Sequence, residues 1–410
     1  MARILVVSPT FPYPTRTGFD VRLAVLVEGL ATEHEVHLLS AASPPSPAAS
    51  SRVPVHVASW ECMAADRDGQ GWQRFARRLY RRVRRPSFVS WAYRPDRLIE
   101  RIEQLDRAGD FDTIIVQTPG LAPVLDRVRH ASRVIDTIDL WHERFRCFAQ
   151  VGEGRLLEHY RDPAIEFDAY RRWGDLVLAI SLHDEARLLA AGIERDRLLH
   201  VPVAFEPRPL TKLASEPNLL FAGASGVTNV DAVAHFVADI LPRVRARVPE
   251  SRLLLLRADD EVQRRFSGVD GVDILPDLDE IDDAYRRTRV AVVPLRIGTG
   301  IKIKVLESFS RGVPTLISPV AAQGLHLDGF AQNPVSLDPT TFASDVVRAL
   351  TSDEYCEALR RSALRLIATH YAPAVVHASL NERISKLRRV DARPAVRHSD
   401  VRGRASSSLT

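Results

Sequence analysis

The chain has 410 residues, of which 45% are hydrophobic and 26% are charged. These fractions are ordinary for a globular protein and exclude a fibrous or largely disordered chain, while the length predicts two or three domains with ample core. The formal net charge of +4 is small for this length and excludes nucleic acid as the principal partner, because no concentrated basic surface is indicated.

The first half of the chain alternates apolar runs with amphipathic segments. We predict strands at Arg3–Ser8, Glu35–Ser40, Val53–Ala58, Asp112–Gln117, Arg133–Asp136, Asp175–Ser181 and Leu198–Val203, and helices at Asp20–Ala31, Ala164–Trp173 and His183–Ala191. Strand, loop, helix and strand at this spacing form βαβ units. The loop from Pro9 to Phe19 contains one glycine, Gly18, and follows a strand, where doubly wound sheets bind ligands. The alternative is a proline-stiffened surface loop.

The segment WQRFARRLYRRVRR, from Trp72 to Arg85, places seven arginines among apolar residues. As a helix it would be basic and amphipathic, which is typical of segments that lie on anionic lipid. Three interpretations stay open for it: a solvated face with an apolar underside, peripheral contact with the inner face of a membrane, and recognition of a phosphorylated acceptor.

Two carboxylates follow the strand that ends at Asp136, in the sequence Asp136-Thr137-Ile138-Asp139. At the end of a strand they form a candidate polar site. The alternative is that Asp139 caps the following helix.

The second half restarts after a proline-rich linker, Pro202 to Pro217. Strands are predicted at Asn218–Ala222, Leu253–Arg257, Val272–Leu275, Val290–Val293 and Thr315–Ser318, and late helices within 343–367 and 372–388. We therefore predict an α/β protein of two Rossmann-like doubly wound domains that face each other across a cleft. The domains are residues 1–204 and 205–371, followed by a helix over 372–390 and a disordered tail over 391–410.

Residues 298–324 read GTGIKIKVLESFSRGVPTLISPVAAQG and carry the strongest site pattern. A buried strand leads into a glycine loop, Gly298-Thr299-Gly300, and then into a helix that carries Lys304 and Glu307. Exposed amides and the helix dipole favour an anion at such a helix start, Lys304 adds a charge suited to phosphate, and Glu307 could accept two ribose hydroxyls. A plain glycine turn with helix-surface pairs between Lys304, Glu307 and Arg311 is the alternative.

This stretch resembles the donor-binding motif of retaining GT-B glycosyltransferases of group 1 (family 4). The shared pattern is strand-Pro-Leu, Gly-x-Gly, Lys, Leu-Glu, Gly-x-Pro and a later Gly-Leu. The segment from Leu219 to Val248 resembles that family's strand, glycine turn at Gly223 and first helix. The resemblance implies that Lys304 contacts the donor diphosphate, that Glu307 binds the ribose, and that Gly18 faces the donor from the opposite domain. It also implies that the terminal helix crosses back onto the first domain.

The chain departs from the family pattern at several positions. Ile138 stands where many relatives carry a histidine, with His142 one helical turn on as a candidate substitute. Residues 224–230 contain no cation, whereas some relatives bind donor phosphates there with Arg and Lys. Arg257 stands where glycine is usual, and Thr299 replaces the first member of a pair of glutamates.

We predict a glycosyltransferase that moves a sugar from a nucleoside diphosphate sugar to an unidentified glycan, lipid-linked or small-molecule acceptor, with retention of anomeric configuration. No metal or other cofactor is expected, because charge developing on the leaving diphosphate would be stabilised by Lys304. Asp139 would orient the acceptor. The predicted nucleotide-sugar-binding residues are Gly18, Gly223, Gly298, Thr299, Gly300, Lys304 and Glu307. The alternatives are a catalytically inactive relative that binds a sugar nucleotide and a sugar-nucleotide epimerase of the same fold.

Where the protein resides is predicted from its cysteines and its hydropathy. Cys62, Cys147 and Cys356 are far apart and have no metal-binding spacing, which fits a reducing, cytoplasmic setting. The start, MARILVVSPTF, is soon interrupted by proline and is not expected to be a signal peptide. No run of about 18 apolar residues predicts a membrane span.

Overall fold

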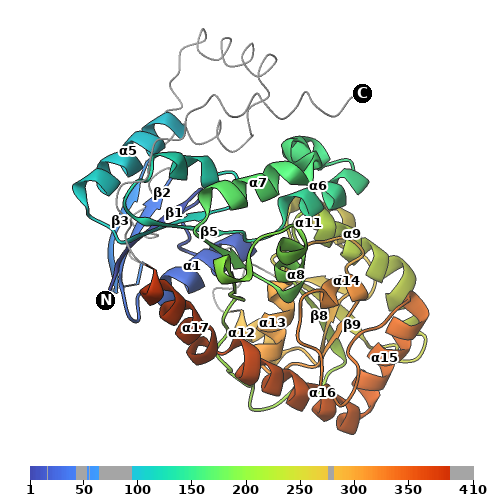
Figure 1. The fold of residues 1–410 in the computed structure, drawn as a ribbon. Coiled ribbons are helices and arrows are strands. Elements are labelled where there is room, and N and C mark those ends of the chain that lie inside the picture. The colour runs from blue at the N-terminus through green and yellow to red at the C-terminus, as the bar shows by residue number, and fades with distance from the viewer. Residues whose placement is uncertain (16, 43–52, 55, 64–94, 276–280, 388–410) are drawn as a thin grey trace. The chain divides into compact units, whose positions relative to one another are not determined.

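The computed structural model describes the chain except for residues 16, 43–52, 55, 64–94, 276–280 and 388–410 (Figure 1). Contacts group it into two compact units, each described by itself below. Unit 1 comprises Met1–Thr137, Ala164–Leu178 and the residues from Asn381 onward, and unit 2 comprises Ile138–Pro163 and Ala179–Leu380. The predicted boundaries at 204 and 371, the cleft and the crossing of the last helix stay predictions, and the tail over 391–410 lies outside the described residues.

Most strands follow the apolar runs of the sequence. They are β1 (Arg3–Ser8), β2 (Glu35–Ser40), β3 (Val57–Cys62), β4 (Thr113–Gln117), β5 (Ser132–Asp136), β6 (Leu176–Ala179), β7 (Leu198–His200), β8 (Asn218–Ala222), β9 (Arg252–Leu256), β10 (Val272–Ile274), β11 (Val290–Val293) and β12 (Thr315–Ile317). In β4 and β11 every residue is buried, which is the continuous apolar pattern of strands covered on both faces.

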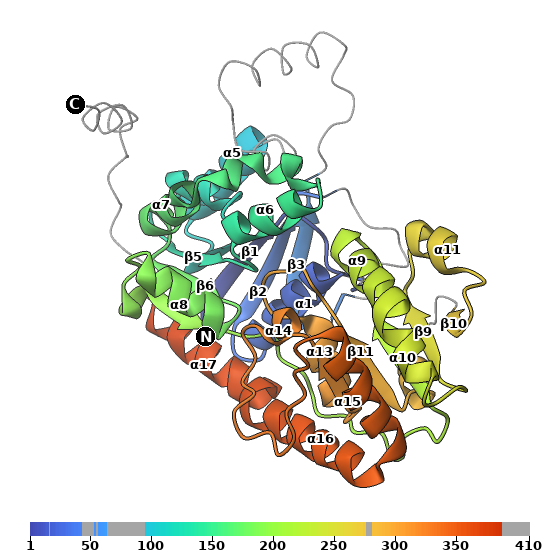
Figure 2. The same cartoon turned by 90° about the vertical axis from the view of Figure 1, so that its right-hand side faces the viewer.

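The helices keep the labels of Figure 1. They are α1 (Gly18–Leu30), α5 (Pro95–Ala108), α6 (Trp141–Gln150), α7 (Pro163–Trp173), α8 (Leu182–Ala190), α9 (Val227–His235), α10 (Leu241–Arg245), α11 (Asp260–Phe266), α12 (Asp282–Arg286), α13 (Ile303–Ser310), α14 (Pro319–Ala322), α15 (Pro339–Thr351), α16 (Asp353–Leu366) and α17 (Pro373–Lys386). Among the helices of unit 2, α15 packs against both α10 and α16 (Figure 2).

The two sheets have related topologies. Their orders are β3-β2-β1-β4-β5-β6-β7 and β10-β9-β8-β11-β12. In the second sheet every neighbouring pair is parallel, as are the pairs from β3 through β6 in the first. Each order runs outward from its first strand in both directions, which is the doubly wound arrangement of nucleotide-binding folds. The predicted α/β fold class is confirmed.

The third strand was predicted in the wrong place. It spans Val57–Cys62 rather than Val53–Ala58. It lies at the edge of its sheet, and Val57 is the only buried residue in it, so it has no apolar run for the sequence to reveal. Pro54, within the predicted span, has no N–H to donate to a neighbouring strand.

A buried ion pair fastens the first helix of unit 1 to its sheet. Arg22 of α1 donates from Nη2 to Asp136 Oδ1 over 2.9 Å and from Nε to Oδ2 over 3.3 Å. Arg22 is 1% exposed and Asp136 is fully buried, and Gln117 also donates to Asp136 Oδ2. Asp136 is therefore committed to this ion pair within unit 1, whereas Asp139 belongs to unit 2, and the polar site of both carboxylates stays a prediction.

Candidate functional site

The site residues of unit 2 gather where the strand order of its sheet reverses. Strands β8 and β11 are neighbours, but the chain leaves them toward opposite sides of the sheet, to β9 and to β12 respectively. Ligands of open parallel sheets bind in the crevice that such a reversal creates at the carboxyl ends of the strands. The loop after β8 contains Gly223 and leads to α9, and the loop after β11 contains Gly298–Gly300 and leads to α13.

Lys302 holds the backbone of the second loop in shape. Its Nζ donates to the carbonyl oxygens of Thr299 over 3.1 Å and of Gly300 over 2.5 Å, and the residue is only 8% exposed. Burial lowers the pKa of Lys302 to about 8, although Asp139 and Asp184 act against this shift. Because its ammonium is committed to two loop carbonyls, Lys302 braces the start of α13 rather than facing outward.

Lys304, in the first turn of α13, reaches back to the first loop. Its Nζ donates to the Gly223 carbonyl over 3.2 Å and to Asn229 Oδ1 over 2.8 Å, and it lies 4.1 Å from the centroid of the Phe221 ring. Burial lowers the pKa of Lys304 to about 7, with Glu307 opposing the shift and Lys302 adding to it. The structure therefore brings Lys304 and Gly223 together, and the Lys304 ammonium is held by neutral groups.

Glu307 lies on the next turn of α13 and is held by two side chains. Tyr285 of α12 donates from its hydroxyl to Glu307 Oε2 over 3.3 Å, and Arg311 places Nη1 3.9 Å from Oε1. The Glu307 side chain is 18% exposed. The Glu307–Arg311 pair foreseen as a helix-surface contact exists, whereas Lys304 turns to Asn229.

Asp139 belongs to unit 2 and contacts the glycine loop directly. Thr299 Oγ1 donates to Asp139 Oδ2 over 2.5 Å, and a Cβ added to Gly300 would lie 3.1 Å from Asp139 Oδ1. Gly300 also has a φ of +62°, so two separate constraints require glycine there. Asp139 does not cap the following helix, because the N-cap of α6 is Leu140 and has no side-chain cap bond. The capping interpretation was wrong.

The surroundings of Asp139 are polar. Arg144 Nη1 lies 3.5 Å from Asp139 Oδ2, and Cys147 Sγ lies 3.7 Å from the Gly298 carbonyl oxygen. Burial first, and the charge of Asp139 second, raise the pKa of the buried Asp184 carboxyl well above its usual value. The loop thus rests on a group of carboxyl, thiol and ammonium side chains.

Two of the family departures adopt left-handed backbone conformations. Ile138 has a φ of +60° and Arg257 a φ of +56°. Each follows the end of a strand, β5 or β9. For residues with a Cβ this region costs about 1–2 kcal/mol, and such strain is concentrated at functional sites. The usual glycine at the position of Arg257 is explained by this conformation.

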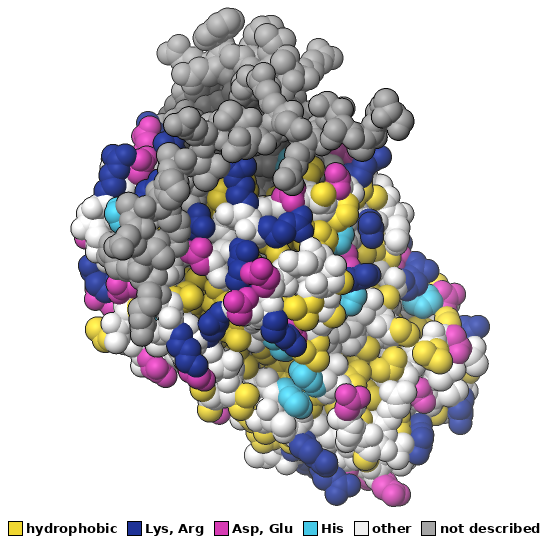
Figure 3. All heavy atoms as spheres, viewed as in Figure 1, with side chains coloured by type: hydrophobic (Ala, Val, Ile, Leu, Met, Phe, Trp, Pro, Cys, Tyr) yellow, Lys and Arg dark blue, Asp and Glu magenta, His cyan; other side chains and the backbone are white. Residues whose placement is uncertain are grey.

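Several sequence predictions concern residues that this site does not include. Gly18 is the first residue of α1, after the N-cap Thr17, and it belongs to unit 1, so its approach to the donor stays a prediction. His142 is buried at the start of α6, and its role as a histidine substitute is also untested. Residues 72–85 lie outside the described part of the chain. On the face drawn in Figure 3, the described Lys and Arg side chains are interspersed with Asp and Glu.

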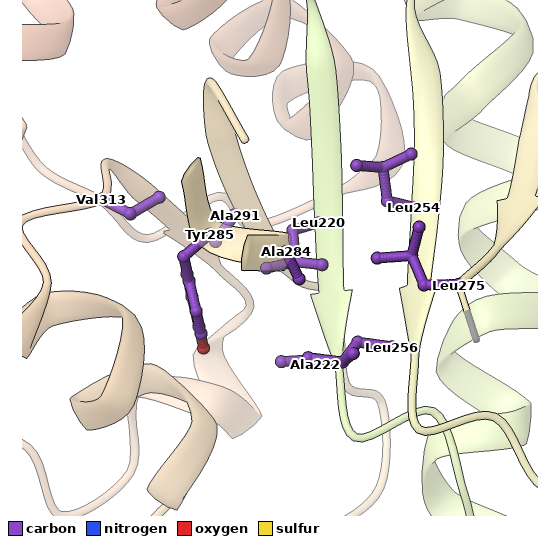
Figure 4. Close-up of a cluster of buried hydrophobic side chains, with 9 residues drawn as sticks. All are labelled: Leu220, Ala222, Leu254, Leu256, Leu275, Ala284, Tyr285, Ala291 and Val313. Atoms are coloured by element: carbon purple, nitrogen blue, oxygen red, sulfur yellow. The ribbon is translucent and has the colours of Figure 1, made fainter. Parts of the chain in front are cut away.

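Sequence reasoning missed three supporting residues: Lys302, Asn229 and Tyr285. Asn229 and Tyr285 contact residues that are 75 and 22 positions away in the chain. Lys302 instead contacts the carbonyl of Thr299, three residues before it. Tyr285 is part of a buried cluster with Leu220, Ala284 and Ala291 (Figure 4). Nothing in the local sequence distinguishes it from an ordinary core residue.

The comparisons with known proteins agree with this geometry. Residues 216–352 match the family model of glycosyl transferases, group 1. The matched segment contains Gly223, the Gly298–Gly300 loop, Lys304 and Glu307. No curated protein sequence matches the chain.

Solved structures resemble the chain over nearly its whole length. Sucrose-phosphate synthase from Thermosynechococcus elongatus has a TM-score of 0.68 at 14% identity, over 93% of this chain and 98% of that chain. HepE from Anabaena, solved with UDP and glucose, has a TM-score of 0.64 at 12% identity, over 94% and 100%. TarM from S. aureus has a TM-score of 0.69 at 8% identity, over 94% and 99%. The chain has the GT-B fold.

Among the described residues, no helix is long and apolar enough to cross a membrane, and no group of three or more His, Cys, Asp and Glu side chains could hold a metal ion. The chain also contains two Asp-x-Asp sequences, at 66–68 and 277–279, which superficially match a metal-binding pattern, and both lie outside the described residues.

Proposed function

We propose that the chain is a retaining, metal-independent glycosyltransferase that uses a nucleoside diphosphate sugar. The observation that carries the proposal is the placement of Lys304 and Glu307. They lie one turn apart on α13, at the strand-order reversal of a sheet whose sequence matches group 1 glycosyl transferases. A diphosphate at the start of α13 would meet the helix amides and Lys304, and Glu307 would accept the ribose hydroxyls.

Electrostatic stabilisation of the leaving group accounts for the proposed chemistry. When the bond from sugar to diphosphate breaks, negative charge grows on the diphosphate, and preorganised donors that face this charge lower the barrier. Lys304 supplies such a donor, and its protonated form becomes more favourable as the anion arrives. We propose retention of configuration and membership of family 4 because the motif around Gly298–Glu307 resembles the donor-binding motif of that retaining family.

Asp139 is proposed to act from the same loop. Thr299 stands where the family pattern has the first of two glutamates, and its hydroxyl donates to Asp139. A carboxylate therefore lies beside the position at which this chain lacks the family's glutamate. We propose that Asp139 orients the acceptor. A similar structure, HepE, has been solved with UDP-glucose, and this makes a uridine diphosphate sugar the first donor to test.

A catalytically inactive relative is the second candidate. Ile138 in place of the family histidine and the absence of cations from the sequence ASGVTNV at 224–230 favour it. Such a protein would keep Lys304 and Glu307 and bind a sugar nucleotide without turnover.

The test is to incubate the protein with a panel of nucleoside diphosphate sugars and to follow release of the nucleoside diphosphate, with and without EDTA. Turnover unaffected by EDTA supports the proposal, tight binding without turnover on any donor supports the inactive relative, and donor isomerisation supports an epimerase.

Lys304→Ala should lose about 1.5–3 kcal/mol of nucleotide binding free energy, while Lys212→Ala, at an exposed lysine, is the matched control. Unchanged binding in Lys304→Ala would refute the role of Lys304.

A further inference from the structure

The two oxygens of the Glu307 carboxylate have different partners. The Tyr285 hydroxyl donates to Oε2 over 3.3 Å, and Arg311 lies 3.9 Å from Oε1. Ser308 Oγ is also 3.3 Å from the Tyr285 hydroxyl, but Ser308 donates to the Lys304 carbonyl over 2.9 Å. With its own proton directed there, Ser308 Oγ can only accept from Tyr285, and the Glu307 carboxylate is the stronger of the two acceptors for the Tyr285 proton.

Both partners of Glu307 are themselves held in place. Tyr285 is fully buried, and its ring belongs to the cluster drawn in Figure 4 with Ala222 and Leu256. Arg311 lies over that ring, with Cζ 4.6 Å from the centroid, and its Nε donates to Asp282 Oδ1 over 2.7 Å. Arg311 Nη1 also donates to the Glu307 backbone carbonyl over 3.1 Å. A rigid core thus determines where the Tyr285 hydroxyl and the Arg311 charge lie, and the hydrogen bond from Tyr285 restrains the carboxylate between them.

The Glu307 carboxylate keeps acceptor positions for a ligand. Each carboxylate oxygen can accept about two hydrogen bonds. Tyr285 occupies one position on Oε2, and Arg311, 3.9 Å from Oε1, is too far away to form a hydrogen bond there, so each oxygen keeps at least one open position. Two adjacent hydroxyls on one sugar ring need two acceptors side by side, and a carboxylate whose rotation is restrained offers them without an added entropy cost on binding.

We propose that Tyr285 and Arg311 are positioning residues that orient Glu307 to accept both ribose hydroxyls of a bound nucleoside diphosphate. This proposal rests on the proposed function, because it needs a nucleotide at α13. It predicts a selective effect, in which loss of the Tyr285 hydroxyl weakens recognition of the ribose hydroxyls and leaves contacts to the base and the diphosphate intact.

The experiment measures binding of UDP, GDP and ADP to the full chain by calorimetry, and then binding of the 2′,3′-dideoxy form of whichever diphosphate binds best. Tyr285→Phe should weaken binding of the ribonucleotide about three- to tenfold and change binding of the dideoxy form less than about twofold. The double variant Tyr285→Phe/Glu307→Gln should bind the ribonucleotide as Glu307→Gln does, because Tyr285 acts through Glu307.

The controls separate this role from a structural one. Tyr355→Phe is the matched variant, since Tyr355 is also buried beneath an arginine, with Arg348 Cζ 4.1 Å from its ring centroid, and it should leave both affinities unchanged. Arg311→Lys, which keeps the charge and loses the planar fork, should reproduce the selective loss if Tyr285→Phe folds poorly. Equal weakening of both ligands, or additive effects in the double variant, would overturn this proposal alone. If no nucleoside diphosphate binds the wild type, the proposed function fails as well.

Discussion

Donor binding should be coupled to the protonation of Lys304. Burial lowers the pKa of this lysine to about 7, because its ammonium has only the Gly223 carbonyl, Asn229 and the Phe221 ring in place of water. A diphosphate beside Nζ would return the pKa toward its ordinary value of about 10.4. The charges that act on the lysine within unit 2 are Glu307, which opposes the shift, and Lys302, which adds to it.

The size of the effect follows from these two pKa values. At pH 8 a lysine with a pKa of about 7 is protonated in about one molecule in eleven, so binding should take up about 0.9 proton, and at pH 6 only about 0.1. Between about pH 7 and 10 the bound state holds more protons than the free state, so raising the pH weakens binding. Affinity should therefore fall about tenfold for each pH unit above 7 in that window.

Calorimetry of UDP binding at pH 8 in buffers of different ionisation enthalpy measures the proton uptake. The observed binding enthalpy, plotted against the ionisation enthalpy of the buffer, has a slope equal to the number of protons taken up. Lys304→Arg is the matched variant, because a guanidinium stays charged throughout this range. It should still bind UDP and show a slope lower by about 0.9 than the wild type. Tight binding by the wild type with no slope, or an unchanged slope in Lys304→Arg, would refute the reasoning.

Two further predictions concern stability. Gly300→Ala should lower the free energy of unfolding by more than Gly192→Ala, because both glycines have positive φ (+62° and +81°) but only Gly300 has a neighbour, Asp139 Oδ1, at 3.1 Å from the added Cβ. The strain alone costs about 1–2 kcal/mol, and equal losses in urea denaturation would show that Asp139 does not confine the loop. Asp136→Ala should cost about 3–5 kcal/mol by removing the carboxylate that pairs with the buried Arg22, and Arg22→Met/Asp136→Leu should recover most of it. A double variant as unstable as Asp136→Ala would contradict that account.

The order of strands and helices was predictable because it depends on local patterns. Apolar runs such as those of β1 and β11 have the composition of strands buried on both faces, and they fell within one or two residues of their predicted bounds. The edge strand β3 was not predictable in the same way, since four of its consecutive residues, Ala58 to Glu61, are exposed. An edge strand is held by backbone hydrogen bonds, which leave no mark on side-chain pattern.

The amino-acid sequence by itself determined the fold class and the motif on α13, because a glycine loop, a lysine and a glutamate at helical spacing are all local features. Only the tertiary structure decided which groups hold those side chains. Asn229 reaches Lys304, Tyr285 reaches Glu307 and Asp139 reaches Thr299 across 75, 22 and 160 residues of chain. Such contacts arise when parallel strands bring the ends of separate loops to one edge of a sheet, and no periodicity in the sequence encodes which residues will meet there.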